Sequence, residues 1–204
     1  MTVLDVVKWA FTAGVTISCA RYAASGQMKH DFQIFKGLSA LDWIKVVVLN
    51  LVVLTATLTG IVLAYTYGPT FLQWSWLTLF ATQGEQGTNL NLAGASIPYF
   101  GIVFMILLIL NFPRLARYED EEFRDGTKNW LDAIPRSIKF GLWHCVVGVP
   151  LCAGILLAFP GLWFTRQYFR GGVERSTLYH ATYNMILGGA LLAYLVLANL
   201  HGSH

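Results

Sequence analysis

The run from Val46 to Tyr67 carries no charged side chain and is rich in Val, Leu, Thr and Ala. A helix that crosses a lipid bilayer needs about 20 consecutive apolar residues, so this run predicts a membrane-spanning helix. The composition agrees, because 55% of the residues are hydrophobic and only 12% are charged, against about 25% charged in ordinary soluble domains. The net charge of +3 indicates membrane topology rather than nucleic-acid binding. The sequence therefore predicts an integral membrane protein in contact with lipids.

Proline and glycine residues divide the other apolar sequence into shorter segments. The first of these has only twelve uncharged residues between Lys8 and Arg21, so it either spans with both basic side chains reaching the interface or lies along the interface as an anchor. No repeat or linker interrupts residues 1–204, which indicates a single domain. We expect an all-α fold, a polytopic helical bundle of about six membrane segments: Trp9–Ala20, Val46–Tyr67, Ser96–Phe112 ended by Pro113, Arg136–Gly148, Pro150–Arg170 and, after Gly171-Gly172, Glu174–Leu200.

The basic residues predict which ends of these segments face the cytoplasm. Apart from Lys8, the fourteen Lys and Arg residues form groups of four in residues 21–45, six in residues 114–139 and three in residues 166–175. A helix break at Pro150 brings all three groups to one face, which the positive-inside rule makes cytoplasmic. The C-terminus is then non-cytoplasmic, in a multi-pass protein of a bacterial plasma membrane or an organellar, thylakoid-like equivalent.

The stretch Tyr118–Gly126 concentrates five acids and one arginine in a chain that is otherwise mostly apolar. It is either a water-facing connection between helices or the charged half of an active site. His144 and His180 favour the second interpretation, since each lies about two turns into a helix that starts from the same cytoplasmic face. Phe140 lies four residues before His144 and Asn184 four residues after His180, so each pair shares one helix face.

Polar groups inside a membrane are costly, usually face the interior of the bundle and often mark a functional site. We expect Glu119, His144, His180 and Asn184 to meet in one cavity open to the cytoplasm. A carboxylate and two imidazoles around a water molecule suggest hydrolysis, with the carboxylate as general base. An Asn and a His donor can stabilise the oxyanion that develops on an attacked amide.

Three short motifs in the second half of the chain contain these residues. They read Glu119-Asp120-Glu121-Glu122-Phe123-Arg124, Phe140-Gly141-Leu142-Trp143-His144 and His180-Ala181-Thr182-Tyr183-Asn184. In this order they resemble the Glu-Glu-x-x-x-Arg, Phe-x-x-x-His and His-x-x-x-Asn motifs of the CAAX protease and bacteriocin-processing (CPBP) family of intramembrane glutamate proteases, Ras-converting endopeptidase type. The likeness covers about residues 96–200, and Asp120 stands where the family has its second Glu.

The resemblance implies an intramembrane endopeptidase that acts on a peptide or protein substrate. It leaves metal use open, and we expect that no cofactor is required and that zinc is a possible one. It also implies a role for each residue of the motifs. Glu119 and His144 activate the attacking water, His180 and Asn184 form the oxyanion site, Arg124 orients the acids, and Asp120 and Phe140 support the site.

Other functions are compatible with the same residues. Glu119, His144 and His180 are a ligand set that can hold zinc, as a Glu and two His do in some hydrolases. Two imidazoles at one depth also suggest haem or chlorophyll ligation, although this leaves Glu119 and Asn184 without a role. A third alternative is a non-catalytic subunit or adaptor that keeps the protease fold within a larger membrane complex.

Overall fold

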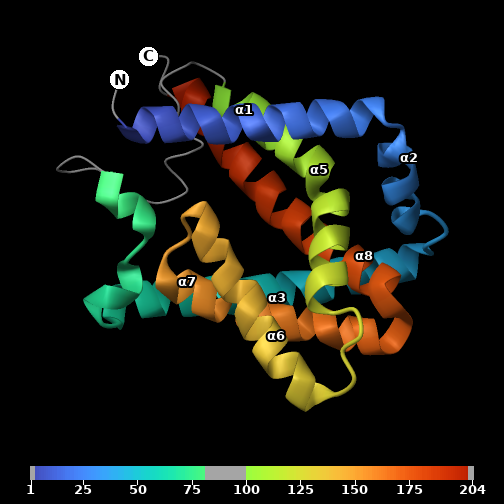
Figure 1. The fold of residues 1–204 in the computed structure, drawn as a ribbon. Coiled ribbons are helices and arrows are strands. Elements are labelled where there is room, and N and C mark those ends of the chain that lie inside the picture. Colours follow the sequence, from blue (N-terminus) through green and yellow to red (C-terminus); the bar gives the residue numbers. More distant parts are fainter. Residues whose placement is uncertain (1–2, 81–99, 202–204) are drawn as a thin grey trace.

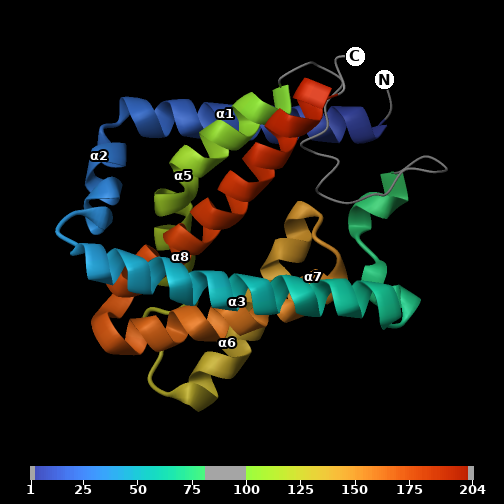
Figure 2. The ribbon, with the colours of Figure 1, turned by 180° about the vertical axis from the view of Figure 1, so that it is seen from behind.

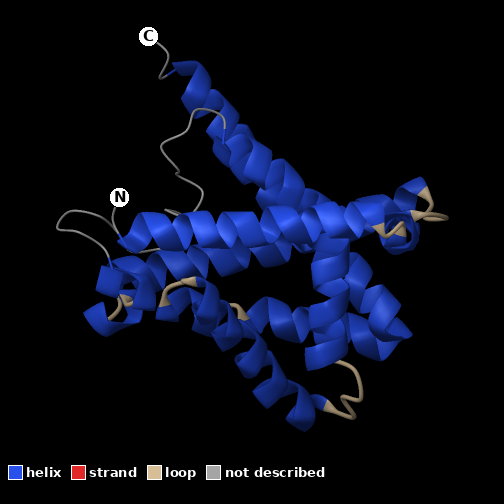
Figure 3. Ribbon diagram, turned by 45° about the horizontal axis from the view of Figure 1, so that its top comes forward, coloured by secondary structure: helices blue, strands red, loops and turns tan. Residues whose placement is uncertain are grey.

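The computed structural model describes residues 3–80 and 100–201, and within these ranges it is helical, without strands (Figure 1, Figure 3). The all-α prediction is therefore confirmed. The α-helices are α1 (Val3–Ala24), α2 (Gln27–Asp31), α3 (Ala40–Tyr67), α5 (Phe100–Phe123), α6 (Trp130–Trp143), α7 (Leu151–Leu156) and α8 (Ala158–His201), with short 3-10 turns at Phe32–Phe35, Thr70–Gln73, Trp76–Phe80 and His144–Val147. Ser96, where we expected the third segment to begin, lies outside the described residues.

Three stretches of the described chain are long and apolar enough to cross a membrane, judged by length and composition. They are Ala40–Tyr67, Gly101–Phe123 and Leu151–Asn199. This supports a membrane protein, but it does not confirm six membrane segments. The predicted segment Arg136–Gly148 corresponds mainly to α6, whose 14 residues extend about 21 Å at 1.5 Å per residue, well short of a hydrocarbon core of about 30 Å.

Pro113 does not end the helix in which it lies, contrary to our expectation. Helix α5 continues through it to Phe123, although proline removes a backbone donor and usually kinks a helix. Next to Pro113, α5 packs closely against α8 at Gly188, where a Cβ would lie 2.7 Å from Phe112 Cε2 and 3.0 Å from Ile109 Cγ1. As a consequence of the continuity of α5, Glu119 to Phe123 of the acidic stretch form its last turn instead of a free loop.

Two predicted breaks are confirmed in the second half of the chain. Helix α6 ends before a 3-10 turn, Gly148 adopts a left-handed conformation with φ of 88°, and Pro150 caps α7. Helix α8 contains a sharp kink at Gly171-Gly172, where Gly172 has φ of 67° and ψ of −165°. The left-handed φ values suit glycine, which has no Cβ to clash with the backbone.

The kink lets the two arms of α8 pack against different partners. Its first arm runs beside α3, and its second arm runs beside α5, while α1 crosses the far end of that pair (Figure 1, Figure 2). Asn50 of α3 joins both arms, because its amide donates to the Tyr179 carbonyl at 2.9 Å and accepts from the Trp163 indole at 3.2 Å. His180 is thereby held between α5, α6 and the first arm.

Helices α6 and α7 form a hairpin that places His144 near its tip. Helix α6 begins at Trp130, six residues before the predicted start, because the Asn129 side chain accepts a hydrogen bond from the Asp132 amide at 3.0 Å and caps the helix. The hairpin is closed by direct backbone contact between Gly141 and Gly154. No side chain fits between them.

We predict that Gly141→Ala destabilises the protein by ~1–3 kcal/mol or more, as overpacking of a close contact does. The new Cβ would meet the Gly154 carbonyl and lie 2.7 Å from the Ala158 nitrogen, and both are backbone atoms that cannot rotate away. Gly189→Ala is the matched control, since its Cβ would meet nothing within 4 Å. Thermal unfolding in detergent measures both. Equal melting temperatures for the two variants would show that the hairpin is not packed this closely.

Candidate active site

The last turns of α5 and the second arm of α8 place one imidazole between two carboxylates. His180 Nε2 lies 3.2 Å from Glu119 Oε2, and His180 Nδ1 lies 3.2 Å from Asp120 Oδ1. His180 and Asp120 are buried, with exposed fractions of 1% and 0%, whereas the Glu119 side chain keeps 21% of its surface exposed. Glu119 is therefore the member of this triad that a substrate or water can reach.

Arg124 completes the charged cluster from the interior side. Its Nη1 donates to Asp120 Oδ1 at 3.1 Å and to the Glu119 carbonyl at 3.3 Å, and only 1% of its surface is exposed. Burial lowers the pKa of the guanidinium, and the carboxylates of Asp120 and Glu119 oppose that shift. Arg124 and Asp120 thus form a buried ion pair, since a buried charge requires a partner of opposite charge.

Aromatic rings form the walls of this cluster. Phe164 stacks on the His180 ring with centroids 4.3 Å apart and an interplanar angle of 18°. Phe140 meets His180 edge-to-face at 5.5 Å and lies 4.1 Å from the Arg124 guanidinium carbon, which sits over its face. The predicted supporting role of Phe140 therefore has a physical basis: it packs between α5 and α8 and fixes the ring of His180.

His144 approaches the same cluster from the other side of Phe140. Its ring meets Phe140 edge-to-face at 4.8 Å, and its Nδ1 lies 2.9 Å from the Phe140 carbonyl oxygen. A carbonyl only accepts, so Nδ1 carries the proton, and in the neutral ring Nε2 keeps a lone pair. Both histidines thus contact one phenylalanine, and His144, which is half-buried, retains a ring nitrogen that can accept a proton.

Asn184 is the predicted site residue that the structure ties least closely to the others. It lies one helical turn after His180 on α8 and is half-buried. Among the described residues, its side-chain amide has no hydrogen-bond partner. It is therefore placed near the cluster by its helix position, and its role as an oxyanion donor stays a prediction.

The distances in the cluster indicate where its protons lie. A ring nitrogen and a carboxylate oxygen 3.2 Å apart need a proton between them, and His180 meets this condition at both nitrogens. The guanidinium of Arg124 stabilises Asp120 as a carboxylate, so the proton between Asp120 and His180 stays on Nδ1 of His180. The pair of Glu119 and His180 then shares one further proton, either as imidazolium with carboxylate or as imidazole with carboxylic acid. Such a pair can release and recover a proton without moving any backbone atom.

The other acids of the stretch face away from this cluster. Glu121 and Glu122 are both exposed, and Glu122 pairs with Lys139 at 3.2 Å. The arginine of the motif pairs with Asp120, one turn earlier on the same helix. Glu119 and Asp120 are therefore the acids of the stretch that contact His180.

A zinc site gains no support from the geometry. In the part of the chain that the structure describes, no three His, Cys, Asp or Glu side chains are arranged to hold a metal ion. Glu119 and His180 contact each other directly, while His144 is turned toward the Phe140 carbonyl. The predicted set of Glu119, His144 and His180 therefore does not form a ready ligand shell.

Phe164 is a site residue that the sequence did not reveal. It stacks on His180 from the first arm of α8, on the far side of the Gly171-Gly172 kink. An aromatic residue in an apolar helix is unremarkable, and only the three-dimensional fold brings it to the histidine. The double glycine was the one sequence signal that the chain reverses there.

No protein-family model, no curated protein and no solved structure matches the chain.

Proposed function

We propose that this protein is an intramembrane endopeptidase that hydrolyses a peptide bond with a water molecule activated by Glu119 and His144. The observation that supports the proposal best is the contact of Glu119 with His180 at 3.2 Å, backed by Asp120 and Arg124. A partly exposed carboxylate held against a buried imidazole is an arrangement suited to general acid–base catalysis. The resemblance to the CPBP motifs points to the same chemistry.

In the proposed reaction, Glu119 accepts a proton from the attacking water as the water oxygen bonds to the carbonyl carbon of the substrate. His144 assists through its free Nε2, since its Nδ1 proton is committed to the Phe140 carbonyl. The carbon–nitrogen bond then breaks, and the proton held by Glu119 passes to the leaving amine. The products are a new carboxyl terminus and a new amino terminus, and Glu119 returns to its starting state.

His180 serves as an oxyanion donor in this proposal, which requires Glu119 to leave its Nε2. In the state described here, that nitrogen is engaged by Glu119. A rotation of Glu119 toward the bound water would free the Nε2 proton for the oxyanion while Asp120 continues to hold Nδ1. Asn184, one turn further along α8, would supply the second donor.

The proposed orientation places the three basic groups on the cytoplasmic face and the C-terminus on the other side. It follows the positive-inside rule. Labelling of single cysteines introduced at Lys128 and at Asn199, near the end of α8, in intact cells tests it. Lys128 should react only after the membrane is permeabilised, and reaction from outside would reverse the orientation.

The experiment that tests the function is cleavage of a quenched fluorescent peptide library by the purified protein in detergent. We expect His144→Ala to lower the rate by about 10²–10⁴-fold, the range for loss of a general base. Leu142→Ala is the control, because Leu142 lies two residues before His144, in the last turn of α6, with its side chain exposed. Equal rates in wild type and His144→Ala would remove His144 from the mechanism.

A non-catalytic subunit is the second candidate, and one observation favours it. Both nitrogens of His180 are already paired inside the protein, as they would be in a purely structural ion cluster. Such a protein should purify with a stable larger assembly and cleave no member of the library. The haem or chlorophyll alternative is weaker, since His180 has no free nitrogen for an axial bond, and an absorption spectrum without a Soret band would exclude haem.

A further inference from the structure

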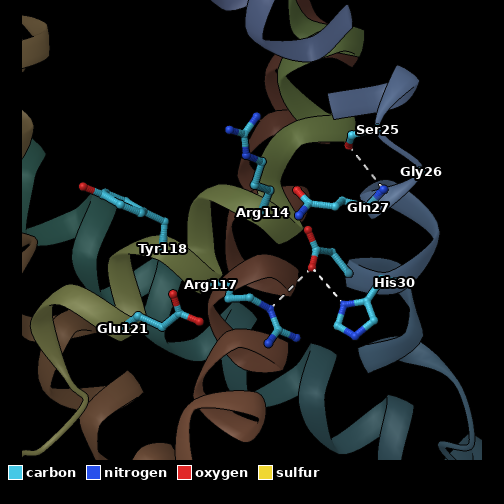
Figure 4. Close-up of a pocket in the computed structure, with 9 residues that line it drawn as sticks. Ser25, Gly26, Gln27, His30, Arg114, Arg117, Tyr118 and Glu121 are labelled. Atoms are coloured by element: carbon cyan, nitrogen blue, oxygen red, sulfur yellow. Dashed lines mark hydrogen bonds and ion pairs between the residues drawn. The ribbon is translucent and has the colours of Figure 1, made fainter. Parts of the chain in front are cut away.

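We propose that a pocket on the opposite side of α5 from Glu119 binds the phosphodiester headgroup of an anionic membrane phospholipid. The pocket has a volume of about 650 Å³ and lies between the corner that joins α1 to α2 and the last turns of α5 (Figure 4). Its wall includes Arg114 and Arg117 from α5 and His30 and Asp31 from α2. It is separate from the site proposed for hydrolysis.

Arg114 is the positive charge that is free to bind an anion here. It is exposed, and its contacts are with a serine hydroxyl and an aromatic ring: Nη1 lies 3.3 Å from Ser18 Oγ, and the guanidinium carbon lies 5.4 Å from the centroid of Tyr22. Within the described residues it forms no ion pair with a carboxylate. A guanidinium presents several donors in one plane, which suits the oxygens of a phosphate group.

The acid at the base of the pocket is already neutralised. Asp31 accepts a hydrogen bond from the Tyr22 hydroxyl at 2.9 Å and lies 3.5 Å from both Arg117 Nε and His30 Nδ1. Burial, followed by the hydrogen bond to Asp31, raises the pKa of Tyr22, so the hydroxyl stays a donor. Glu121 is the remaining acid of the wall, and it is exposed at the rim.

An apolar stripe on α5 leads into the pocket. Val103, Ile106 and Leu110 are exposed by 53%, 44% and 39%, and their spacing places them on the helix face that continues to Arg114 and Arg117. These residues belong to a helix apolar enough to span a membrane. A stripe of aliphatic side chains that ends in a guanidinium matches a lipid, whose acyl chain follows the helix and whose phosphate meets the arginines.

The test is native mass spectrometry of the purified protein titrated with short-chain phosphatidylglycerol and, separately, with phosphatidylcholine. We expect wild type to prefer phosphatidylglycerol and Arg114→Gln to weaken its binding by about tenfold, as loss of a charge-assisted hydrogen bond predicts. Arg170→Gln is the control, since Arg170 is an exposed arginine outside the pocket. Glu121→Gln should strengthen binding, because it removes a negative charge from the rim.

Several results would overturn the proposal. Equal affinity of wild type for the two lipids would exclude recognition of an anionic headgroup. Unchanged binding in Arg114→Gln, or the same loss in Arg170→Gln, would exclude this pocket. Displacement of the lipid by millimolar glycerol phosphate would show that a soluble phosphate is the ligand instead. The melting temperatures of the variants, measured in parallel, separate loss of the site from loss of the fold.

Discussion

Glu119→Gln should abolish peptide hydrolysis while leaving the protein folded. The amide keeps the size of the side chain but cannot take a proton from water, so we expect a loss of about 10²–10⁴-fold in rate, the contribution typical of a general base. The partly exposed position of Glu119, on the accessible side of a buried His180, is the reason that this residue is chosen. The measurement is the initial rate of peptide cleavage at saturating and at limiting substrate.

Glu122→Gln is the matched control for this variant. Glu122 belongs to the same acidic stretch, but it is exposed and pairs with Lys139 at the surface. Surface ion pairs contribute only about 0–1 kcal/mol, so both rate and stability should stay close to wild type. Equal losses in the two variants would mean that the acidic stretch acts through its total charge and that Glu119 has no special role.

Arg124→Leu should be the most destabilising single change in the charged cluster, by ~3–5 kcal/mol. Leucine leaves the buried Asp120 carboxylate without the cation that lies 3.1 Å from it, and it removes the guanidinium that packs on the Phe140 ring. The measurement is the midpoint of chemical unfolding in detergent. Arg170→Leu, which replaces an exposed arginine, should change the midpoint little.

A double variant separates the charge effect from a simple packing defect. If the cost comes from the unpaired Asp120, then Asp120→Asn combined with Arg124→Leu should be more stable than Arg124→Leu alone, since the buried charge is removed together with its partner. A double variant that is less stable than Arg124→Leu would contradict the assignment of Arg124 as the counter-charge of Asp120.

The sequence was informative where single residues determine the backbone. The breaks at Pro150 and at Gly171-Gly172 are present, because proline lacks a donor and glycine accepts conformations that other residues avoid. The long apolar run Val46–Tyr67 lies within one helix, α3. The pairing of Phe140 with His144 on one helix face is also confirmed by their ring contact.

Some features of the fold depend on contacts between segments that are distant in the sequence. Pro113 lies inside α5, where Gly188 of α8 lets the two helices approach closely, and no local pattern reveals that distant partner. The motif assigned Asp120 a supporting place, and the structure adds the contacts that the sequence does not reveal, with His180 and Arg124. Contacts between segments about 60 residues apart depend on the fold, which local spacing does not encode.

The central claim is that Glu119, as the general base, and His180, as the oxyanion donor, act together in one step of peptide hydrolysis. A double-mutant cycle on kcat/KM tests it directly, with Glu119→Gln, His180→Gln and the double variant measured on one peptide substrate. Residues that act as a unit have strongly non-additive effects, so we predict that the double variant is no slower than the slower single variant. Losses that multiply in the double variant would show that the two residues act independently and would contradict the proposed site.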